Sequence, residues 1–563
     1  MKRRKLALVL ALVLAFSLVL GACSNKESGQ SSGSNGGSDD NPPAGNGDNG
    51  GSGGEKVLTI ASPYTIGSLT PWISNSDGDR YVIGNVYEAL IEVNTGAKDG
   101  VEYVPTIAES WEYTDDTTLV FKIRDNVYWQ TEGNDLFDEK VQVKAADVKA
   151  VLDFVLDESN GSTEWGDLSP LVESVEATDD FTLTIHAKKP SAILLYELSG
   201  VLIFPMKAIE EDFDLTAQPV GTGAFIFSDY KVDDRVTLLP NPDYRVKPNL
   251  DKVIIEIVPD KAVAAIALQN EEVDIVPQIL TTDLEAVASK DFLTLLPNSV
   301  GWYRYLAFNC SNDIFKDIKV RQAISMAIDF EAITETLFSN DFGAQLAVDA
   351  YGGGVPLEFE GADVDAWKAV YEYNPEKAQQ LLEEAGWSKN SSGIYEKDGQ
   401  TLSFSIKCPT SDQNRVKLGE MAATYLKSIG IDAAAQPTEW ATMTADISAG
   451  NTEMFVMGGG SVIGGMNMLF HSVATQSSAH NVFYEDLELN AMLDEAYATV
   501  DDAKRVELLK QCAMRALENK VHAGGYFEYV QVGMNTRVKD FDKSPTLWYS
   551  LCNDYRNVDV EVK

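Results

Sequence analysis

A long stretch near the start of the chain has almost nothing that a folded core could bury. From residue 24 to about residue 55 the sequence consists almost wholly of Gly, Ser, Asn, Asp and Pro. Such a composition cannot offset the entropy lost when a chain becomes ordered. We therefore expect a flexible tether, and about 32 residues of this kind reach roughly 30 Å. The folded part of the protein should begin near residue 56.

The residues before the tether have the pattern of a secretory signal. Four basic residues precede an apolar run from Leu6 to Leu20, and small residues follow it. A membrane-spanning helix needs about 20 apolar residues, and this run is shorter, so we expect residues 1–22 to be removed. The residues from Leu20 to Cys23 resemble the lipobox of bacterial lipoproteins, which implies that Cys23 carries a lipid and anchors the chain. The alternative is an ordinary signal peptide that ends in a chance cysteine.

Length and charge limit what the remaining chain can be. Removing 22 of the 563 residues leaves 541, more than one hydrophobic core usually holds, so we expect two or three lobes. With 45 Lys and Arg against 86 Asp and Glu, the net charge is −41. This charge argues against a nucleic-acid partner and against adsorption of the folded part onto anionic lipid. The five cysteines form no CxxC motif, so one or two disulfides are the most that we expect.

Short strands and well-marked helices alternate along the folded part, which predicts an α/β fold. In the run TLVFKIR, Leu119, Phe121 and Ile123 fall on one face of a strand. The run YNPEKAQQLLEEAGW predicts a helix that Asn374 caps at its start and Gly386 ends. These apolar stripes are core faces and say nothing about a ligand.

The inventory of reactive residues gives no support to an enzyme. The four histidines, His186, His471, His480 and His522, form no HExxH motif, and neither a P-loop nor a GxGxxG turn is present. We therefore predict no catalytic residues, no metal site and no cofactor. A secreted hydrolase that uses two carboxylates is the least favoured alternative, because no residues meet the geometric roles of such a site. A metal held by His471 and His480 is less favoured than two solvated or core histidines.

Several runs of sequence occur in an order that is specific to one family. These are NVYEALIEVNTGAKDGVEYVPTIAESWEYTDDTTLVFKIRDNVYW, VGTGAFIFSDY, NPDYRVKPNLDKVIIEIVPD, ALQNEEVDIV, LAFNCSNDIFKDIKVRQAISMAID and YNPEKAQQLLEEAGW. Together they resemble the family 5 extracellular solute-binding proteins, which serve oligopeptide, dipeptide and nickel ABC importers. The resemblance covers nearly the whole folded part. Lys144 departs from it, because a helix-capping Thr is usual there.

The resemblance implies an α/β, three-lobed, periplasmic-binding-protein-like fold of the Venus flytrap type. Lobe I is expected to comprise residues 56–90, 218–298 and 530–563, lobe II residues 91–217, and lobe III residues 299–529. Two chain crossings form the expected hinge, and residues 23–55 form the lipid-anchored linker. The expected partners are a solute, two permease subunits and their ATPases, with the protein itself a monomer. Its expected place is the outer face of the cytoplasmic membrane, in a cell without an outer membrane.

The same resemblance places the solute between lobes I and III. In peptide-binding members a tryptophan and an aspartate of lobe III line the site, and the aspartate meets the amino end of the ligand. In the run EMFVMGGGSVIGGMNMLFHS, Gly459 and Val462 stand at those two positions. The candidate solute-binding residues are Tyr64, Asn75, Ser76, Asp77, Trp302, Asn309, Trp440, Gly458, Gly459, Gly460, Ser461 and Val462.

Three explanations fit the missing aspartate. The ligand can be an oligopeptide whose amino end is blocked or is met by another acid, such as Glu439 or Asp77. It can be another solute, an oligosaccharide or a metal complex, with Trp440, Tyr64 and Trp302 as stacking faces. The third explanation is a slip of one or two residues in the alignment of this glycine-rich run, which also has the plain reading of a turn. A receptor that senses a peptide without importing it is a further alternative.

Overall fold

The computed structural model describes residues 54–562, apart from 74–75, 95–101, 298–301, 339–343, 347–371, 460–464, 477, 529 and 542–553. Cys23 therefore lies outside the described residues, as do Asn75, Gly460, Ser461 and Val462. Within the described ranges, no helix is long and apolar enough to cross a membrane.

The first of three large sheets has seven strands drawn from distant parts of the chain. Strand β1 lies at its centre and pairs in parallel with β10 and β11, whereas β22, from near the end of the chain, lies between β12 and β11. In spatial order the strands are β12 (Leu293–Pro297), β22 (Gln531–Asn535), β11 (Ile275–Ile279), β1 (Val57–Ser62), β10 (Lys252–Ile257), β9 (Arg235–Pro240) and β8 (Phe225–Lys231). The helices α1 (Asp77–Val86), α6 (Lys261–Gln269) and α7 (Leu284–Ala288) pack against it.

The second sheet is antiparallel and has four strands. Its order is β4 (Ala108–Asp115), β5 (Thr118–Ile123), β7 (Thr182–Ala187) and β6 (Val172–Asp179). In β5, Leu119, Phe121 and Ile123 are buried, which confirms the alternation predicted from sequence. The helices associated with this part of the chain are α2 (Ala145–Val155), η1 (Glu158–Asn160), α3 (Trp165–Leu168), α4 (Leu194–Gly200) and α5 (Met206–Glu210).

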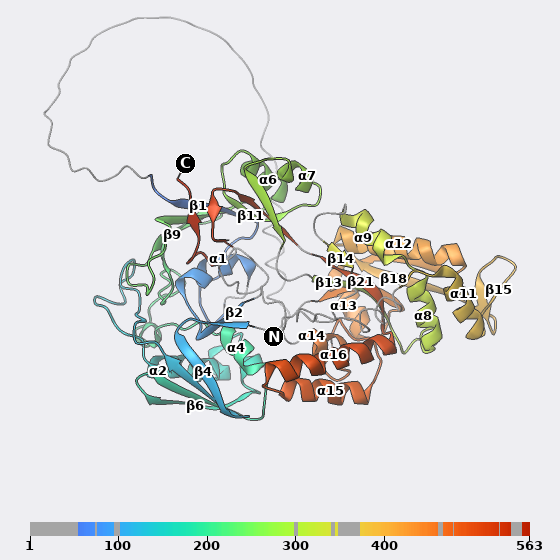
Figure 1. The fold of residues 1–563 in the computed structure, drawn as a ribbon, viewed down its shortest axis with the longest axis horizontal. Helices are drawn as coiled ribbons and strands as arrows, with labels where there is room; N and C mark the ends of the chain where they lie inside the picture. The colour runs from blue at the N-terminus through green and yellow to red at the C-terminus, as the bar shows by residue number, and fades with distance from the viewer. Residues whose placement is uncertain are drawn as a thin grey trace, which may run out of the picture. The chain divides into compact units, whose positions relative to one another are not determined.

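The third sheet has six strands and comes from one continuous part of the chain. Its order is β14 (Ala344–Leu346), β21 (His522–Glu528), β13 (Trp302–Phe308), β20 (Met454–Gly459), β18 (Ser403–Pro409) and β19 (Asp432–Thr438). Figure 1 shows α15 (Leu487–Ala498) and α16 (Asp502–Asn519) lying side by side in this part of the protein. The other helices are α8 (Ile318–Met326), α9 (Phe330–Phe338), α11 (Pro375–Glu384), α12 (Gln413–Ile429), α13 (Trp440–Ser448) and α14 (Gly465–Phe470).

The helix ends predicted from sequence are confirmed. The side chain of Asn374 accepts a hydrogen bond from the backbone N–H of Lys377 and so caps α11. Gly386, which follows the helix, has a φ of +88°, a conformation that glycine adopts without strain. Small pairings complete the fold: β2 (Ile91–Asn94) with β3 (Glu102–Pro105), β15 (Ser388–Lys389) with β16 (Tyr395–Lys397) and β17 (Gln400–Thr401), and β23 (Val538–Lys539) with β24 (Asp559–Val560).

The chain passes between the seven-stranded and six-stranded sheets through two neighbouring connections. Strand β12 leads into β13, and β21 leads back into β22. On one side of the crossing Pro297 pairs with Gln531, and on the other side Trp302 pairs with Glu528. The two connections therefore join one antiparallel pair of strands to another. This is the arrangement expected of a two-crossing hinge.

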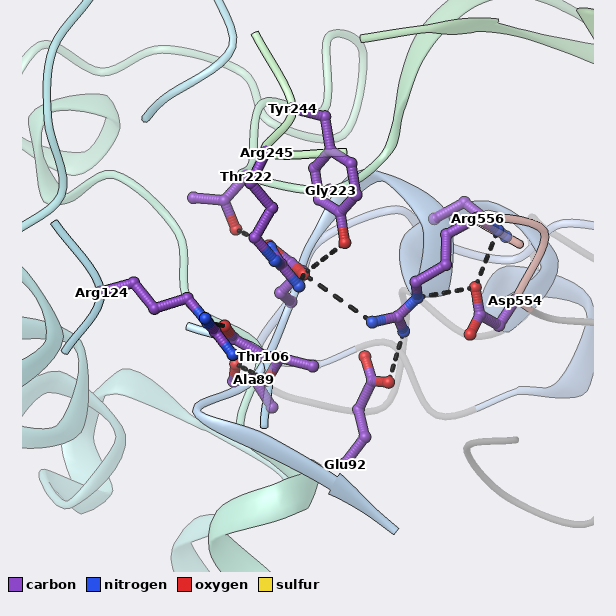
Figure 2. A network of polar contacts seen from close by, with 12 residues as sticks. Ala89, Glu92, Thr106, Arg124, Thr222, Gly223, Tyr244, Arg245, Asp554 and Arg556 are labelled. Atoms are coloured by element: carbon purple, nitrogen blue, oxygen red, sulfur yellow. Dashed lines mark hydrogen bonds and ion pairs between the residues drawn. The ribbon is translucent and has the colours of Figure 1, made fainter. Parts of the chain in front are cut away.

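A buried network of charges ties the end of the chain to β2 (Figure 2). Arg556 forms ion pairs with Glu92 and with Asp554, the latter at 2.9 Å between Nε and Oδ1. Arg245 binds both oxygens of Glu88, at 2.7 and 2.9 Å. Buried ion pairs of this kind are costly to break singly, so the terminal segment is an integral part of the fold.

The three large sheets fall within the three segments predicted as lobes, while the lobe boundaries themselves remain predictions. Cys310, Cys408 and Cys512 are buried and unpaired, and Cys552 lies outside the described residues. No disulfide therefore joins the cysteines that the structure describes.

Candidate functional site

One edge of the six-stranded sheet brings together elements that suit ligand binding. The parallel strands β18, β19 and β20 all end there, and helices α12 and α13 begin just after β18 and β19. Strand β13 starts at this edge and β21 ends at it, because Trp302 pairs with Glu528. In open α/β sheets, ligands bind outside the carboxyl ends of the strands. We refer to this place as the strand-end edge.

Several residues predicted from sequence lie at the strand-end edge. Trp440 is the first residue of α13, and 40% of its surface is exposed, unusual for so large an apolar group. Gly458 and Gly459 end β20 and pair with Arg304 and Tyr303 of β13. Trp302 begins β13. Four of the residues predicted from sequence thus lie at the same edge, and their role in binding a solute stays a prediction.

Asn309 lies elsewhere and is corrected here. It follows the far end of β13, is 2% exposed, and its side-chain amide donates to the carbonyls of Gly450 and Thr452 at 3.1 and 2.8 Å. The side chain therefore holds the loop before β20 in place. It is a structural residue and does not belong to the strand-end edge.

Four charged residues that the sequence did not single out gather at this edge. Nε of Arg304 donates to Glu528 at 2.8 Å, and Nε of Arg415 donates to Asp412 at 2.7 Å. Asp412 also caps α12 by accepting from the backbone N–H of Arg415. Burial alone raises the pKa of Asp412, but the Arg415 guanidinium outweighs it, so the pKa lies below the ordinary value. The guanidinium of Arg415 lies 5.4 Å from the ring centre of Trp440, within range of a cation–π contact.

Gly458 makes room for one of these cations. A Cβ atom at this position would lie 2.5 Å from Nη1 of Arg304 and 2.9 Å from its Cδ. No side chain fits there unless Arg304 moves. The glycine therefore has a packing role beside the Arg304–Glu528 pair, in addition to its place at the end of β20.

Glu439 is one of the acids that the sequence offered as a substitute for the missing aspartate. In the structure it caps a helix. Its carboxylate accepts from the backbone N–H of Thr442 at 3.0 Å and caps α13. Hydrogen bonds from the first turn, with that of Ala441 the largest contribution, lower its pKa.

The seven-stranded sheet has a comparable polar group at the carboxyl ends of its parallel strands. Tyr64 follows β1, and its hydroxyl accepts from the amide of Gln278 on β11 at 2.8 Å. Burial, and then the charge of Asp77, raise the pKa of Tyr64 to about 12. Ser76 caps α1 by accepting from the backbone N–H of Asp79. Tyr64, Ser76 and Asp77 thus lie near one another, and Gln278 joins them. We refer to these four residues as the Tyr64 group, and their role in binding a solute stays a prediction.

The two chain crossings keep the strand-end edge of the six-stranded sheet near the polar residues at the strand ends of the seven-stranded sheet. Glu528, at the strand-end edge, is three residues before Gln531, the first residue of β22. A fully extended chain covers at most about 3.6 Å per residue, so their Cα atoms are at most about 11 Å apart. Any change in the angle between the sheets must therefore take place beside the strand-end edge.

Two of the histidines each contact a side chain of another kind. His471 lies 3.5 Å from Asp494, whereas Nδ1 of His480 lies 2.7 Å from the hydroxyl of Tyr305. Burial lowers the pKa of His480 to about 4. Among the described residues, the one group of three possible ligand side chains with oxygens within 4.8 Å is Glu164, Asp167 and Glu197.

Two sheets joined by two crossings, with polar side chains at the ends of their parallel strands, define a class of lobed α/β binding proteins. Comparison with known proteins supports the assignment to this class. Residues 102–481 match the model of the bacterial extracellular solute-binding proteins, family 5. The chain is 27% identical to the oligopeptide-binding protein AppA of Bacillus subtilis over 564 residues, covering 97% of each chain. It is 28% identical to heme-binding protein A of Haemophilus influenzae, covering 82% of this chain and 85% of the relative.

The chain belongs to family 5 of the bacterial extracellular solute-binding proteins. It is an extracytoplasmic solute-binding protein of an ABC transporter, and its relatives are binding proteins and not enzymes. Among solved structures, NikZ of Campylobacter jejuni in complex with Ni(L-His) superposes with a TM-score of 0.68 at 24% identity, covering 89% of this chain and 99% of that chain. This likeness confirms the α/β, lobed, periplasmic-binding-protein-like fold.

Proposed function

We propose that the protein captures an oligopeptide between the strand-end edge and the Tyr64 group, and hands it to an ABC permease. The two neighbouring crossings carry this proposal, because they keep both polar groups close and place the hinge between them. Closure around a solute then buries it between two preformed surfaces. An extended peptide suits such a site, since its backbone offers donors and acceptors along its whole length.

The choice of a peptide rests on the relatives and on the chemistry of the edge. The Bacillus subtilis relative, matched over 97% of both chains, is named for oligopeptides. The strand-end edge carries two arginines, Arg304 and Arg415, each bonded to a carboxylate of the protein, which suits a polar solute. The exposed ring of Trp440 also suits a solute with a planar ring, which makes a heme-like or metal-complex solute the second candidate.

Native mass spectrometry of the protein, purified without denaturation, tests the proposal. We expect a ladder of adducts at peptide masses, because a closed site releases its solute slowly. A single adduct of non-peptide mass contradicts the peptide proposal and favours the second candidate. Deleting the cognate permease and following peptide uptake then separates an importer from a receptor that only senses peptides.

We also propose that Cys23 carries a lipid that anchors the protein to the membrane surface, with residues 24–55 as the tether. The composition of these residues and the pattern of residues 1–22 support this anchor.

A further inference from the structure

The helix pair α15 and α16 touches another part of the chain at a place outside the hinge. The backbone N–H of Ala192, just before α4, donates to the carbonyl of Tyr497, near the end of α15, at 2.8 Å. Ala192 belongs to the part of the chain that holds the four-stranded sheet, and Tyr497 to the part that holds the six-stranded sheet. This hydrogen bond therefore links two of the three large sheets.

Apolar side chains are buried around this hydrogen bond. Helix α4 packs against β2, and Val93 of β2 is 4% exposed and belongs to the hydrophobic core of the six-stranded sheet. Tyr103, Ile193 and Tyr196 pack against the same core, and Tyr103 and Ile193 also contact the core of the other two sheets. We refer to Val93, Tyr103, Ala192, Ile193 and Tyr196 as the α4 seat.

The α4 seat also faces the start of α16. Burial raises the pKa of Tyr103 well above its ordinary value, while the charge of Arg505 lowers it and that of Asp502 raises it further. Both charges lie in the first turn of α16 and act on Tyr113 as well. The hydroxyl of Tyr113 donates at 3.5 Å to the carbonyl of Ser191, directly before the α4 seat. The α4 seat thus meets the end of one helix of the pair and the beginning of the other.

The seven-stranded and four-stranded sheets share one hydrophobic core, which includes Leu58 of β1 and Phe121 of β5. They therefore move together. The six-stranded sheet has a core of its own, and the two crossings connect it to the seven-stranded sheet. A rotation of the six-stranded sheet about these crossings pulls α15 away from the α4 seat. The α4 seat is therefore intact only over a narrow range of hinge angles.

The hydroxyl of Tyr103 limits the strength of the α4 seat. It is buried and has no hydrogen-bond partner among the residues that the structure describes. In an open state water binds this hydroxyl, so that closing costs the bond to water. Burial of the few apolar side chains favours closing, and the two effects partly cancel. Such a balance suits a contact that forms and separates repeatedly.

We propose, resting on the solute-binding function above, that the α4 seat is a closing contact, intact when the protein encloses a solute and broken when the site opens. None of its residues belongs to the strand-end edge or to the Tyr64 group. It therefore stabilises the closed state whichever solute is enclosed, which raises all affinities by one common factor and slows release. The preference for one solute over another stays with the strand-end edge and the Tyr64 group.

Hydrogen exchange of the full-length protein measures the α4 seat directly. Mass spectrometry of fragments small enough to isolate the amide of Ala192 gives its exchange rate, and a tryptic digest of casein serves as the solute probe. We expect this amide to exchange about tenfold more slowly with the digest than without it, because only the closed state holds its hydrogen bond. Equal exchange rates while peptides are captured overturn the proposal.

Two substitutions in the α4 seat should act in opposite directions. Ile193→Ser removes an apolar contact and should weaken the capture of all peptides of the digest by about fivefold, with their relative amounts unchanged. Tyr103→Phe removes the unpartnered hydroxyl and should slow the release of the same peptides. Ile209→Ser is the matched control, because Ile209 lies on α5 and is 38% exposed. It should capture and release peptides like the wild type.

Two results from these variants overturn the proposal. One is a changed order of preference among the peptides in Ile193→Ser, and the other is release from Tyr103→Phe that is no slower than from the wild type. Melting temperatures show whether each variant is folded. Tyr103→Phe removes a single oxygen atom, so it keeps the test valid if Ile193→Ser does not fold.

The α4 seat can also be tested without a solute, which separates this proposal from the peptide function. If no peptide of the digest is captured, the peptide function fails, but the exchange of the Ala192 amide still compares the three proteins. We expect the slowest exchange in Tyr103→Phe, an intermediate rate in the wild type and the fastest exchange in Ile193→Ser. The same rate in all three overturns the α4 seat as a contact that opens and closes.

Discussion

At the scale of single residues, the position of Arg304 at the strand-end edge depends on the absence of a side chain at Gly458. Replacing Gly458 by Ala places a Cβ within 2.5 Å of Nη1 of Arg304, so the guanidinium must leave its place beside Glu528. We expect about a tenfold loss of solute affinity and a loss of stability of about 1 to 3 kcal/mol, because the largely buried pair of Arg304 and Glu528 is broken. Calorimetric titration with the solute found by mass spectrometry measures the effect.

The control for this change is Gly166→Ala. An added Cβ at Gly166 meets nothing within 4 Å, so this variant should bind and unfold like the wild type. Unchanged affinity in Gly458→Ala contradicts the role given to Arg304 at the edge.

His480 predicts a dependence of stability on pH. Its folded pKa of about 4 lies below the ordinary value of 6.5, so the unfolded chain takes up the proton first as the pH falls. The stabilisation is complete above about pH 6.5 and is lost as the pH falls towards 4. Between pH 7 and pH 5 this residue should cost about 2 kcal/mol. Urea unfolding at both pH values measures the loss.

The variant His480→Gln isolates this contribution. A glutamine can still accept from the hydroxyl of Tyr305 but does not titrate. The difference in stability between pH 7 and pH 5 should therefore shrink by about 2 kcal/mol. An identical pH dependence in wild type and variant excludes His480 as its source. His522, whose pKa burial also lowers, should supply the remaining slope in the same direction.

Residues at the candidate site show what a single sequence can and cannot locate. Gly458, Gly459 and Trp440 stand within or beside recognisable segments, so the sequence alone could single them out. The partner of Arg304 is Glu528, 224 residues away, and no local pattern connects them. Asn309 was misplaced for the same reason, because its partners lie 141 and 143 residues away.

At the scale of elements, the pair of helices α15 and α16 depends on one aspartate. Asp486 caps α15, accepting from the backbone N–H groups of Glu488 and Leu489. It also binds Arg515 of α16 through two bonds of 2.8 and 2.9 Å. Burial raises the pKa of Asp486, but the bonds from Arg515, Leu489 and Asn519 outweigh it and lower the pKa to about 2.

Substitutions at Asp486 should separate the cap from the ion pair. Asp486→Ala loses both, and we expect a loss of about 2 to 4 kcal/mol from a cap and a charged hydrogen bond together. Asp486→Asn keeps the cap and should lose less. Urea unfolding of both variants provides the comparison, and equal losses would show that the cap contributes nothing.

Individual strands and helices were easier to predict than the elements that lie beside them in the fold. The strand β5 and the helix α11 follow from local periodicity and from their capping residues, which act within a few positions. The position of β22 between β12 and β11 does not, because it depends on packing between segments more than 200 residues apart. The order of strands along the chain does not determine their order across a sheet.

At the scale of the whole molecule, the proposed anchor has a direct test. Replacing Cys23 by Ala removes the thiol that carries the lipid, so the full-length protein should move from the membrane fraction to the medium. Fractionation followed by immunoblotting measures the distribution. A tether shortened by deleting residues 30–50 is the matched control, since it should stay with the membranes. Retention of the Cys23→Ala protein on membranes contradicts a lipid anchor.

The path of the chain through its sheets also sets an order of folding. The six-stranded sheet needs only residues between Trp302 and Glu528, so all its strands are present before β22 has been made. The seven-stranded sheet lacks one of its interior strands until Gln531–Asn535 arrives and inserts between β12 and β11. Closing that long loop is slow, because the entropy is lost before the contacts form. Until it closes, β11 and β12 present unpaired edges. The chain is therefore most prone to aggregation at this stage of its folding.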